Sequence, residues 1–175
     1  MGAASDVGLE VASEDASELL ANLLQLYLHD MSEIFPIAVG ADGRFGYENL
    51  PRFWSEPETH FAFLIRSAAR VAGFALVTRG SPASDDPAAL DVAEFFVLRS
   101  HRRSGIGARA AGLLWDRRPG HWIVRVSHAN RAGVPFWEKT VRDYTHGTFS
   151  AYERPGMHHP FRVFSFTSGA PTAAA

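Results

Sequence analysis

A run of basic residues and glycines in the middle of the chain has the composition of an anion-binding loop. Residues 99–107 read RSHRRSGIG and lie between an apolar stretch typical of a strand and one typical of a helix. Glycine lets the backbone approach a ligand closely, and the start of a helix offers unpaired N–H groups at the positive end of its dipole. Arg102 and Arg103 add forked cationic donors. We therefore expect this loop to hold the diphosphate of a cofactor.

Two other phosphate-binding motifs agree less well with this segment. Residues 105–110 match the pattern G-x-G-x-x-A of dinucleotide-binding folds, but the glycines do not follow the strand directly. No acidic residue ends the next strand, where a ribose partner is expected about 20 residues further on. The Gly-Lys-Ser/Thr sequence of a P-loop is also absent. A nicotinamide-dependent oxidoreductase is therefore the third and weakest hypothesis.

The loop resembles the acyl-CoA-binding segment of the GNAT superfamily of acetyltransferases. Arg102, Gly105 and Gly107 match the R-x-x-G-x-G signature of that family. The signature begins five residues after Val97, which matches the strand residue whose backbone flanks the acyl group in the family. The resemblance therefore implies that acetyl-CoA is the cofactor.

Two further segments extend the resemblance. Asn130, Phe136 and Trp137 fit the family's second CoA-contacting motif, N-x-x-A-x-x-[FL]-[YW], with Gly133 in place of the alanine. Residues 26–33 read LYLHDMSE and are similar to the L-Y-x-H-D-x-S-E segment of a subgroup of predicted bacterial acetyltransferases. The resemblance implies an α/β (mixed α+β) fold with a mostly antiparallel sheet of six to seven strands flanked by helices. The residues that it places against the cofactor are Phe96, Val97, Leu98, Arg102, Arg103, Ser104, Gly105, Ile106, Gly107, Ala108, Asn130, Phe136 and Trp137.

The composition limits the classes of function. The 175 residues, 46% of them hydrophobic, predict one globular domain over residues 1–175, with disordered ends at 1–12 and 169–175. A net charge of −2 gives no general attraction to nucleic acid or to anionic membranes. The basic residues cluster over 99–118, which favours a small anionic ligand. No apolar run is long enough to span a membrane, and the start of the chain lacks a signal-peptide pattern, so we expect a cytoplasmic protein.

The absence of cysteine narrows the chemistry further. It excludes disulfides, a cysteine-ligated zinc ion and a cysteine nucleophile. An acyl group therefore cannot pass through an enzyme thiol, and direct transfer within a ternary complex is favoured. His158 and His159 lack a third ligand at a suitable spacing, so we expect no metal.

Hydrophobic spacing predicts the elements that position these residues. Helices are expected over 16–29, 105–117 and 131–142, with a helical turn over 31–35 and a short helix over 48–54. Strands are expected over 60–66, 71–78, 90–98, 122–126, 144–152 and 161–166, the first two forming a hairpin. Asn130 is placed to cap the third main helix. The irregular connection over 36–57 is long enough to suggest a functional loop.

Three groups are candidates for catalysis. Glu94 is a carboxylate within an apolar strand, so burial is expected to raise its pKa toward that of a general base, although an arginine partner or solvent could instead satisfy it. The resemblance implies that the backbone N–H of Val97 stabilises the oxyanion. Many family members carry a tyrosine where this chain has Trp137, an indole that cannot titrate as an acid. Either Tyr144 replaces that acid or the thiolate leaves unaided.

The acceptor is expected to lie against the first helices, the long connection that follows them and the last hairpin. Tyr27, His29, Asp30 and Glu33 form an unusually polar end to an apolar helix, although solvated charges at a helix terminus are the alternative. Trp54 is an aromatic candidate for the same pocket, together with Phe45, Tyr47 and Phe53, although such residues are more often core.

The resulting hypothesis is an N-acetyltransferase that moves the acetyl group of acetyl-CoA to a primary amine of a small molecule. Neither nucleic acid nor a membrane is an expected partner, and the chain is expected to be a monomer or a homodimer. The alternative is a non-catalytic acyl-CoA-binding or sensing module that has kept the loop and lost the acid.

Overall fold

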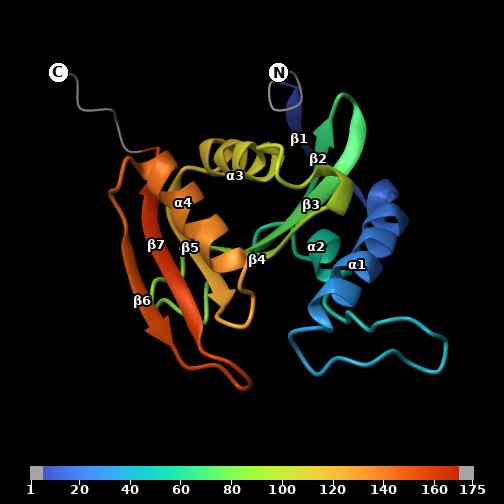
Figure 1. Cartoon of the computed structure of the whole chain (residues 1–175). Coiled ribbons are helices and arrows are strands. Elements are labelled where there is room, and N and C mark those ends of the chain that lie inside the picture. Colours follow the sequence, from blue (N-terminus) through green and yellow to red (C-terminus); the bar gives the residue numbers. More distant parts are fainter. Residues whose placement is uncertain (1–5, 170–175) are drawn as a thin grey trace.

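A seven-stranded mixed sheet organises residues 6–169, which are the residues that the computed structural model describes (Figure 1). The strands are β1 (Val7–Val11), β2 (His60–Ser67), β3 (Arg70–Arg79), β4 (Leu90–Val97), β5 (Gly120–Ser127), β6 (Ser150–Arg154) and β7 (Phe161–Ser168). The helices are α1 (Ser17–Met31), α2 (Arg52–Ser55), α3 (Ile106–Arg117) and α4 (Gly133–Thr145). The strand order is β1-β2-β3-β4-β5-β7-β6, and only β4 and β5 are parallel. The predicted mixed, mostly antiparallel sheet flanked by helices is confirmed.

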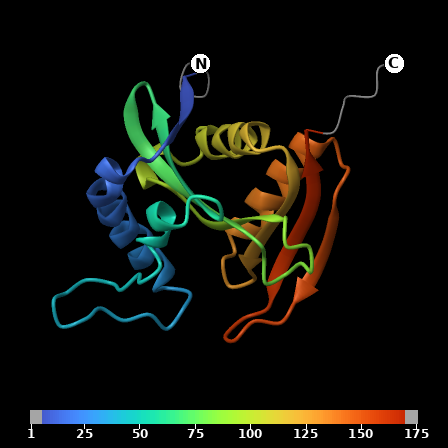
Figure 2. The same ribbon diagram turned by 180° about the vertical axis from the view of Figure 1, so that it is seen from behind.

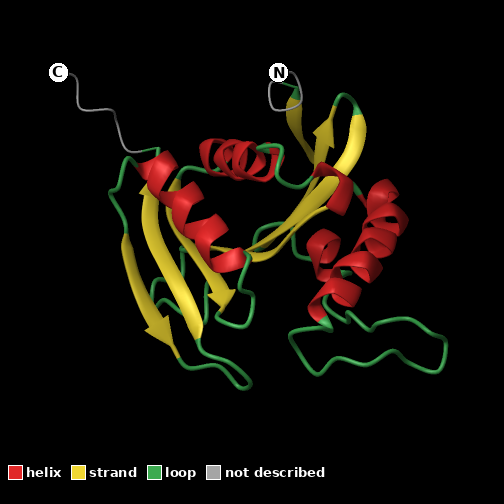
Figure 3. Cartoon of the chain, viewed as in Figure 1, coloured by secondary structure: helices red, strands yellow, loops and turns green. Residues whose placement is uncertain are grey.

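The two faces of the sheet carry different helices. Alternate residues of β2 point to opposite sides: Phe61 and Phe63 pack in the cluster that contains Trp115 of α3 and Trp137 of α4. Ala62 and Leu64 pack instead with residues of α1 and α2. Figure 3 shows these two helix pairs as separate groups along the sheet. Within residues 6–169 no helix has the length and apolar character needed to cross a bilayer.

The hairpin predicted over 60–78 is confirmed as β2 and β3, but the prediction of a frayed start is wrong in part. Residues 7–11 form β1, which pairs antiparallel with residues 63–67 of β2. Val7 and Leu9 pack against buried residues of the core, so partners distant in sequence stabilise a segment too short to be recognised by its own pattern. The other end residues predicted to be frayed, 1–5 and 170–175, lie outside the described residues.

The strand predicted over 144–152 begins later than expected. Helix α4 continues to Thr145, so Tyr144 is helical, and β6 starts only at Ser150. The apolar helical spacing from Trp137 through Val141 extends to Tyr144, which packs on the same core. The helix ends where His146 and Gly147 adopt left-handed backbone angles, with φ of 52° and 84°.

The central feature of the sheet is the separation of β4 from β5. Their parallel pairing covers only residues 90–92 of β4 and 122–124 of β5. Just beyond it, the pairing of β4 with β3 shifts register, because Val92 and Glu94 face consecutive residues of β3 and Ala93 has no partner. Such a bulge bends a strand and increases its twist. The two strands therefore part, and the sheet opens between them.

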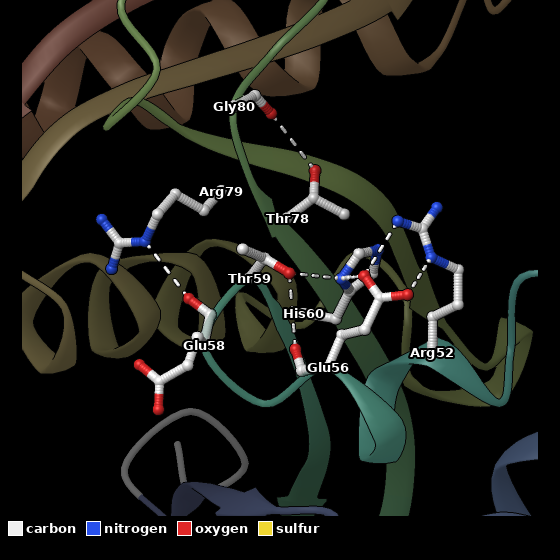
Figure 4. A network of polar contacts seen from close by, with 8 residues as sticks. All are labelled: Arg52, Glu56, Glu58, Thr59, His60, Thr78, Arg79 and Gly80. Carbon is white, nitrogen blue, oxygen red and sulfur yellow. Dashed lines mark hydrogen bonds and ion pairs between the residues drawn. The ribbon is translucent and has the colours of Figure 1, made fainter.

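Side-chain contacts hold the middle of the long connection over residues 32–51, which extends away from the sheet in Figure 2, and the segment that follows its end. At its centre the amide of Gln25 in α1 bonds the backbone of Phe45 twice, at 2.8 and 3.0 Å. Just beyond its end Arg52 donates two hydrogen bonds to Glu56, which lies 3.5 Å from the Nδ1 of His60 in β2 (Figure 4). These contacts fix the connection against α1 and β2.

Candidate active site

A cavity of about 340 Å³ occupies the opening between β4 and β5. Its walls come from α1 and the connection after it, from both strands, from the start of α4 and from the start of β7. The lining residues are Tyr27, Leu28, Met31, Phe35, Ile37, Val92, Ala93, Glu94, Phe95, Val124, Arg125, Val126, Ser127, Asn130, Trp137 and Phe161. Glu94 is the one carboxylate among them, so it dominates the chemistry of this space.

Glu94 is held by two tyrosines from outside its own strand. The hydroxyl of Tyr27 donates to Oε2 at 2.5 Å, and the hydroxyl of Tyr47 donates to Oε1 at 3.1 Å. Burial raises the pKa of Glu94, although these two hydrogen bonds and the charge of Arg125 act in the opposite direction. Burial and the neighbouring Glu94 likewise raise the pKa values of Tyr27 and Tyr47, so both remain donors. A carboxylate with a raised pKa at a cavity wall is suited to take a proton from a substrate.

The charge of Arg125 is neutralised by the carboxylate of Asp91. Its Nε and one terminal nitrogen donate to the two oxygens of Asp91 at 2.8 and 3.0 Å. Asp91 is fully buried and also accepts a hydrogen bond from the hydroxyl of Ser81. This paired geometry satisfies the buried carboxylate and balances the charge of Arg125, which still lowers the pKa of Glu94.

The loop before α3 presents a run of free backbone donors. Within residues 6–169 the amides of residues 103–108 have no hydrogen-bond acceptor. Arg103 and Gly105 have positive φ angles of 60° and 84°, which turn the chain sharply into the helix. A Cβ on Gly107 would lie 3.1 Å from the ring of Phe136, so glycine here lets α3 and α4 approach closely. These donors, at the positive end of α3, form a nest for an anion.

Arg102 and Asp30 are joined to each other. Arg102 donates from Nε to the carbonyl of Val97 at 2.8 Å and from a terminal nitrogen to Asp30 at 2.6 Å. Arg99 donates to the other oxygen of Asp30 at 2.6 Å. Burial opposes the ionisation of Asp30, but the hydrogen bonds from the two arginines hold its pKa below the usual value. The cluster therefore links the end of α1 to the end of β4.

The amide of Val97 points into the opening. The next amide, of Leu98, donates to the carbonyl of Ala72 in β3 at 2.8 Å. Because successive amides of a strand point to opposite edges, the Val97 N–H faces away from β3 and toward the gap. The side chains of Phe96 and Leu98 pack in the core on the α1 side, and by the same alternation the amides of both residues face β3 rather than the opening.

The second motif lies across the gap from β4. The Oδ1 of Asn130 accepts a hydrogen bond from the amide of Gly133, the first residue of α4, at 2.8 Å, although the N-cap position itself is occupied by Ala132. A Cβ at Gly133 would lie 2.5 Å from the Asn130 amide, so the glycine that replaces the expected alanine makes room for this hydrogen bond. Trp137 packs edge-on against Phe95 with ring centres 5.0 Å apart. Both Asn130 and Trp137 line the cavity.

Of the eight predicted catalytic and acceptor-binding residues, Glu94 and Tyr27 line the cavity, and the other six, including Val97 and Asp30, are not in its lining. The hydroxyl of Tyr144 donates to Asp116 at 2.8 Å, and burial and that carboxylate raise its pKa to about 12. The indole of Trp54 donates to the carbonyl of Ala12 and packs in the core below α1. The structure does not bring these two residues to the cavity. Two further predicted residues, His29 and Glu33, are exposed and absent from its lining.

Several lining residues were not found from the sequence. Arg125 is a lone charge in an otherwise apolar strand, the same signal that identified Glu94. The apolar residues of the connection and of β7 carry no such signal, because only the fold brings them together. The residues concerned are Met31, Phe35, Ile37, Arg125, Ser127 and Phe161.

Solved structures with the same architecture are acetyltransferases. An acetyltransferase from Thermus thermophilus superposes with a TM-score of 0.66 at 13% identity, over 94% of this chain and 99% of that one. A spermidine N-acetyltransferase from Vibrio cholerae in complex with CoA and spermine gives a TM-score of 0.64 at 11% identity, over 94% and 96%. A GNAT-family acetyltransferase from Streptococcus pneumoniae gives 0.60 at 17% identity, over 93% and 99%.

Comparisons of sequence add nothing to this result, since no protein-family model and no curated protein match the chain. The likeness is therefore one of structure, and it extends over nearly the whole length of the chain and of its neighbours. Residues 6–169 have the fold of the GNAT acetyltransferases.

Proposed function

We propose that this protein transfers the acetyl group of acetyl-CoA to a primary amine by direct transfer in a ternary complex. The observation that carries the proposal is the opening between β4 and β5. Glu94, whose carboxyl has a raised pKa, lines the cavity in this opening, and the Val97 amide and the free amides before α3 belong to the end of the same strand and to the loop that follows it. The acetyltransferase fold of the neighbouring structures supports the same reaction.

The residues present fit acetyl-CoA. The amides of residues 103–108 have no acceptor within the described chain and form the type of donor set that binds phosphate oxygens. The exposed guanidinium of Arg103 stands beside them. Asn130, Phe136 and Trp137 would flank the arm that runs from this nest into the cavity. When bound, acetyl-CoA supplies an acetyl thioester at the end of that arm.

Glu94 would accept the proton that the amine loses, directly or through a water molecule. The amine nitrogen then bonds to the acetyl carbon while the carbon–sulfur bond breaks, and the electron pair leaves with sulfur. The amide of Val97 is oriented to donate to the acyl oxygen as negative charge develops there. Because Tyr144 bonds Asp116 and Trp137 cannot titrate, the thiolate would take its proton from solvent.

Two measurements test the proposal. Calorimetric titration should detect acetyl-CoA binding, and a thiol-release assay with a panel of primary amines should detect turnover. Initial-rate lines that intersect when both substrates are varied would agree with a ternary complex, whereas parallel lines would contradict it.

The second candidate is a non-catalytic acyl-CoA-binding module. It is favoured by one observation, the absence of a titrating side chain at the position of Trp137. Tight binding of acetyl-CoA without thiol release for any amine would establish this candidate and overturn the transferase.

A further inference from the structure

The wall opposite Asn130 and Trp137 is almost wholly apolar. It is formed by Leu28 and Met31 at the end of α1, by Phe35 and Ile37 in the connection, and by Phe161 at the start of β7. His159 closes this wall, because its Nε2 lies 3.1 Å from the carbonyl of Ile34 and its ring lies 6.2 Å from that of Phe35. An acceptor that enters here meets hydrocarbon on most sides.

The cavity lining carries one carboxyl group, that of Glu94, and one guanidinium, that of Arg125. Arg125 and Asp91 cancel each other through two hydrogen bonds. Tyr27 and Tyr47 stay neutral because their pKa values are raised. Glu94 remains as the one acid in the lining of the described chain. A polyamine needs several carboxylates along its length, and this lining provides one.

The size of the cavity sets a third limit. Its volume of about 340 Å³ is at the small end of ligand sites. The end of the acetyl-CoA arm must occupy part of the same space. What is left accommodates a small molecule and is too small for an oligosaccharide.

Resting on the proposed function, we propose that the acceptor is a small primary monoamine with an apolar, arylalkyl-type body and no carboxylate. Its amino group lies at Glu94, and its body lies against Met31, Phe35 and Ile37. A carboxylate on the acceptor would face Glu94 without gaining a free cation, since Arg125 is already paired.

The test compares amines that differ in one feature at a time. Phenethylamine carries the apolar body and one amine, phenylalanine adds a carboxylate, spermidine adds positive charges, and a peptide amide with an N-terminal alanine adds backbone. In the thiol-release assay, kcat/KM for phenethylamine should exceed each of the others by about tenfold or more. If any of the other three has the highest kcat/KM, the substrate class is wrong while the transferase stands. Thiol release with none of them, despite acetyl-CoA binding, would overturn both.

A matched pair of variants tests the wall itself. Ile37→Asp adds a second carboxylate at the rim of the cavity and should shift the ratio of kcat/KM from phenethylamine toward spermidine by about tenfold. Val39→Asp places the same charge two residues away in the same connection, on a side chain that is 52% exposed and outside the lining. This control variant should keep the wild-type ratio of kcat/KM for phenethylamine to kcat/KM for spermidine. Equal ratios in the two variants would contradict the placement of the acceptor.

Discussion

The two walls of the cavity are built in different ways. The wall from the start of α4 is formed by Asn130 and Trp137, and the loop before α3 presents backbone, the free amides of residues 103–108. The wall from α1 and its connection presents side chains, with Tyr27 and Tyr47 converging on Glu94 from positions 67 and 47 residues away. Backbone donors suit a constant ligand group such as a phosphate, whereas side chains can be exchanged to suit a particular acceptor. Under the proposed function, the backbone donors would hold the cofactor and the side chains from α1 and its connection would select the acceptor.

The largest expected effect is the fall in kcat/KM when Glu94 is replaced. Glu94→Gln keeps the size of the side chain and one of the two acceptor oxygens but removes the base, so kcat/KM should fall about 100-fold. The dissociation constant of acetyl-CoA should stay unchanged, because the carboxylate belongs to the acceptor wall. Glu48→Gln, at an exposed glutamate beside Tyr47, is the matched control and should keep wild-type activity. Wild-type rates in Glu94→Gln would remove Glu94 from the mechanism.

The next effect concerns stability. Asp91→Asn leaves Arg125 without its partner in a site where the aspartate is fully buried, so the free energy of unfolding should fall by about 3 kcal/mol. Denaturant unfolding measures this change. In the double variant Asp91→Asn with Arg125→Met the unpaired charge is gone, and most of the loss should be recovered. If the double variant is no more stable than Asp91→Asn alone, the claim that Asp91 and Arg125 neutralise each other is wrong.

The third prediction separates two neighbouring arginines of the loop before α3. Arg103 is exposed beside the free amides, so Arg103→Ala should weaken acetyl-CoA binding about tenfold with no change in thermal stability. Arg102→Ala should weaken binding, mainly through KM, and also lower the free energy of unfolding by about 1 kcal/mol, because Arg102 joins Val97 to Asp30. Calorimetric titration and thermal melts measure both quantities. An unchanged dissociation constant in Arg103→Ala would show that its charge does not contribute.

The smallest effect is a shift in pH dependence. Activity requires ionised Glu94 and should fall as the pH drops through its raised pKa. The hydrogen bond from Tyr47 lowers that pKa, so Tyr47→Phe should move the acid limb of kcat/KM to higher pH with a loss of only a few-fold at the optimum. A pH–rate profile measures the shift. Movement of the limb to lower pH would contradict the role of this hydrogen bond.

More of the cofactor side of the site than of the acceptor side could be predicted from the sequence, and the reason is physical. The loop before α3 and the Asn130 segment are local motifs, in which the residues that act together are close in sequence. Glu94 could be identified from the sequence as a candidate base because it is a carboxylate within an otherwise apolar strand. The partners of Glu94 and the apolar wall depend on how the connection folds back over the sheet, which its own pattern does not encode.

The misplaced elements have the same cause. β1 is stabilised by pairing with β2 and by packing of Val7 and Leu9, neither of which is visible in a five-residue pattern. Tyr144 was predicted to begin a strand, but it packs edge-on against Trp115 and the helix continues through this position. Tertiary contacts outweighed local preference in both cases.

The most direct test of the central claim is a titration of the isotopically labelled protein with CoA, followed through its backbone amide NMR resonances. The amides of residues 103–108 should show the largest shifts, since their donors would bind the diphosphate. Binding of CoA that leaves these resonances unchanged, or that shifts another region instead, would contradict the account.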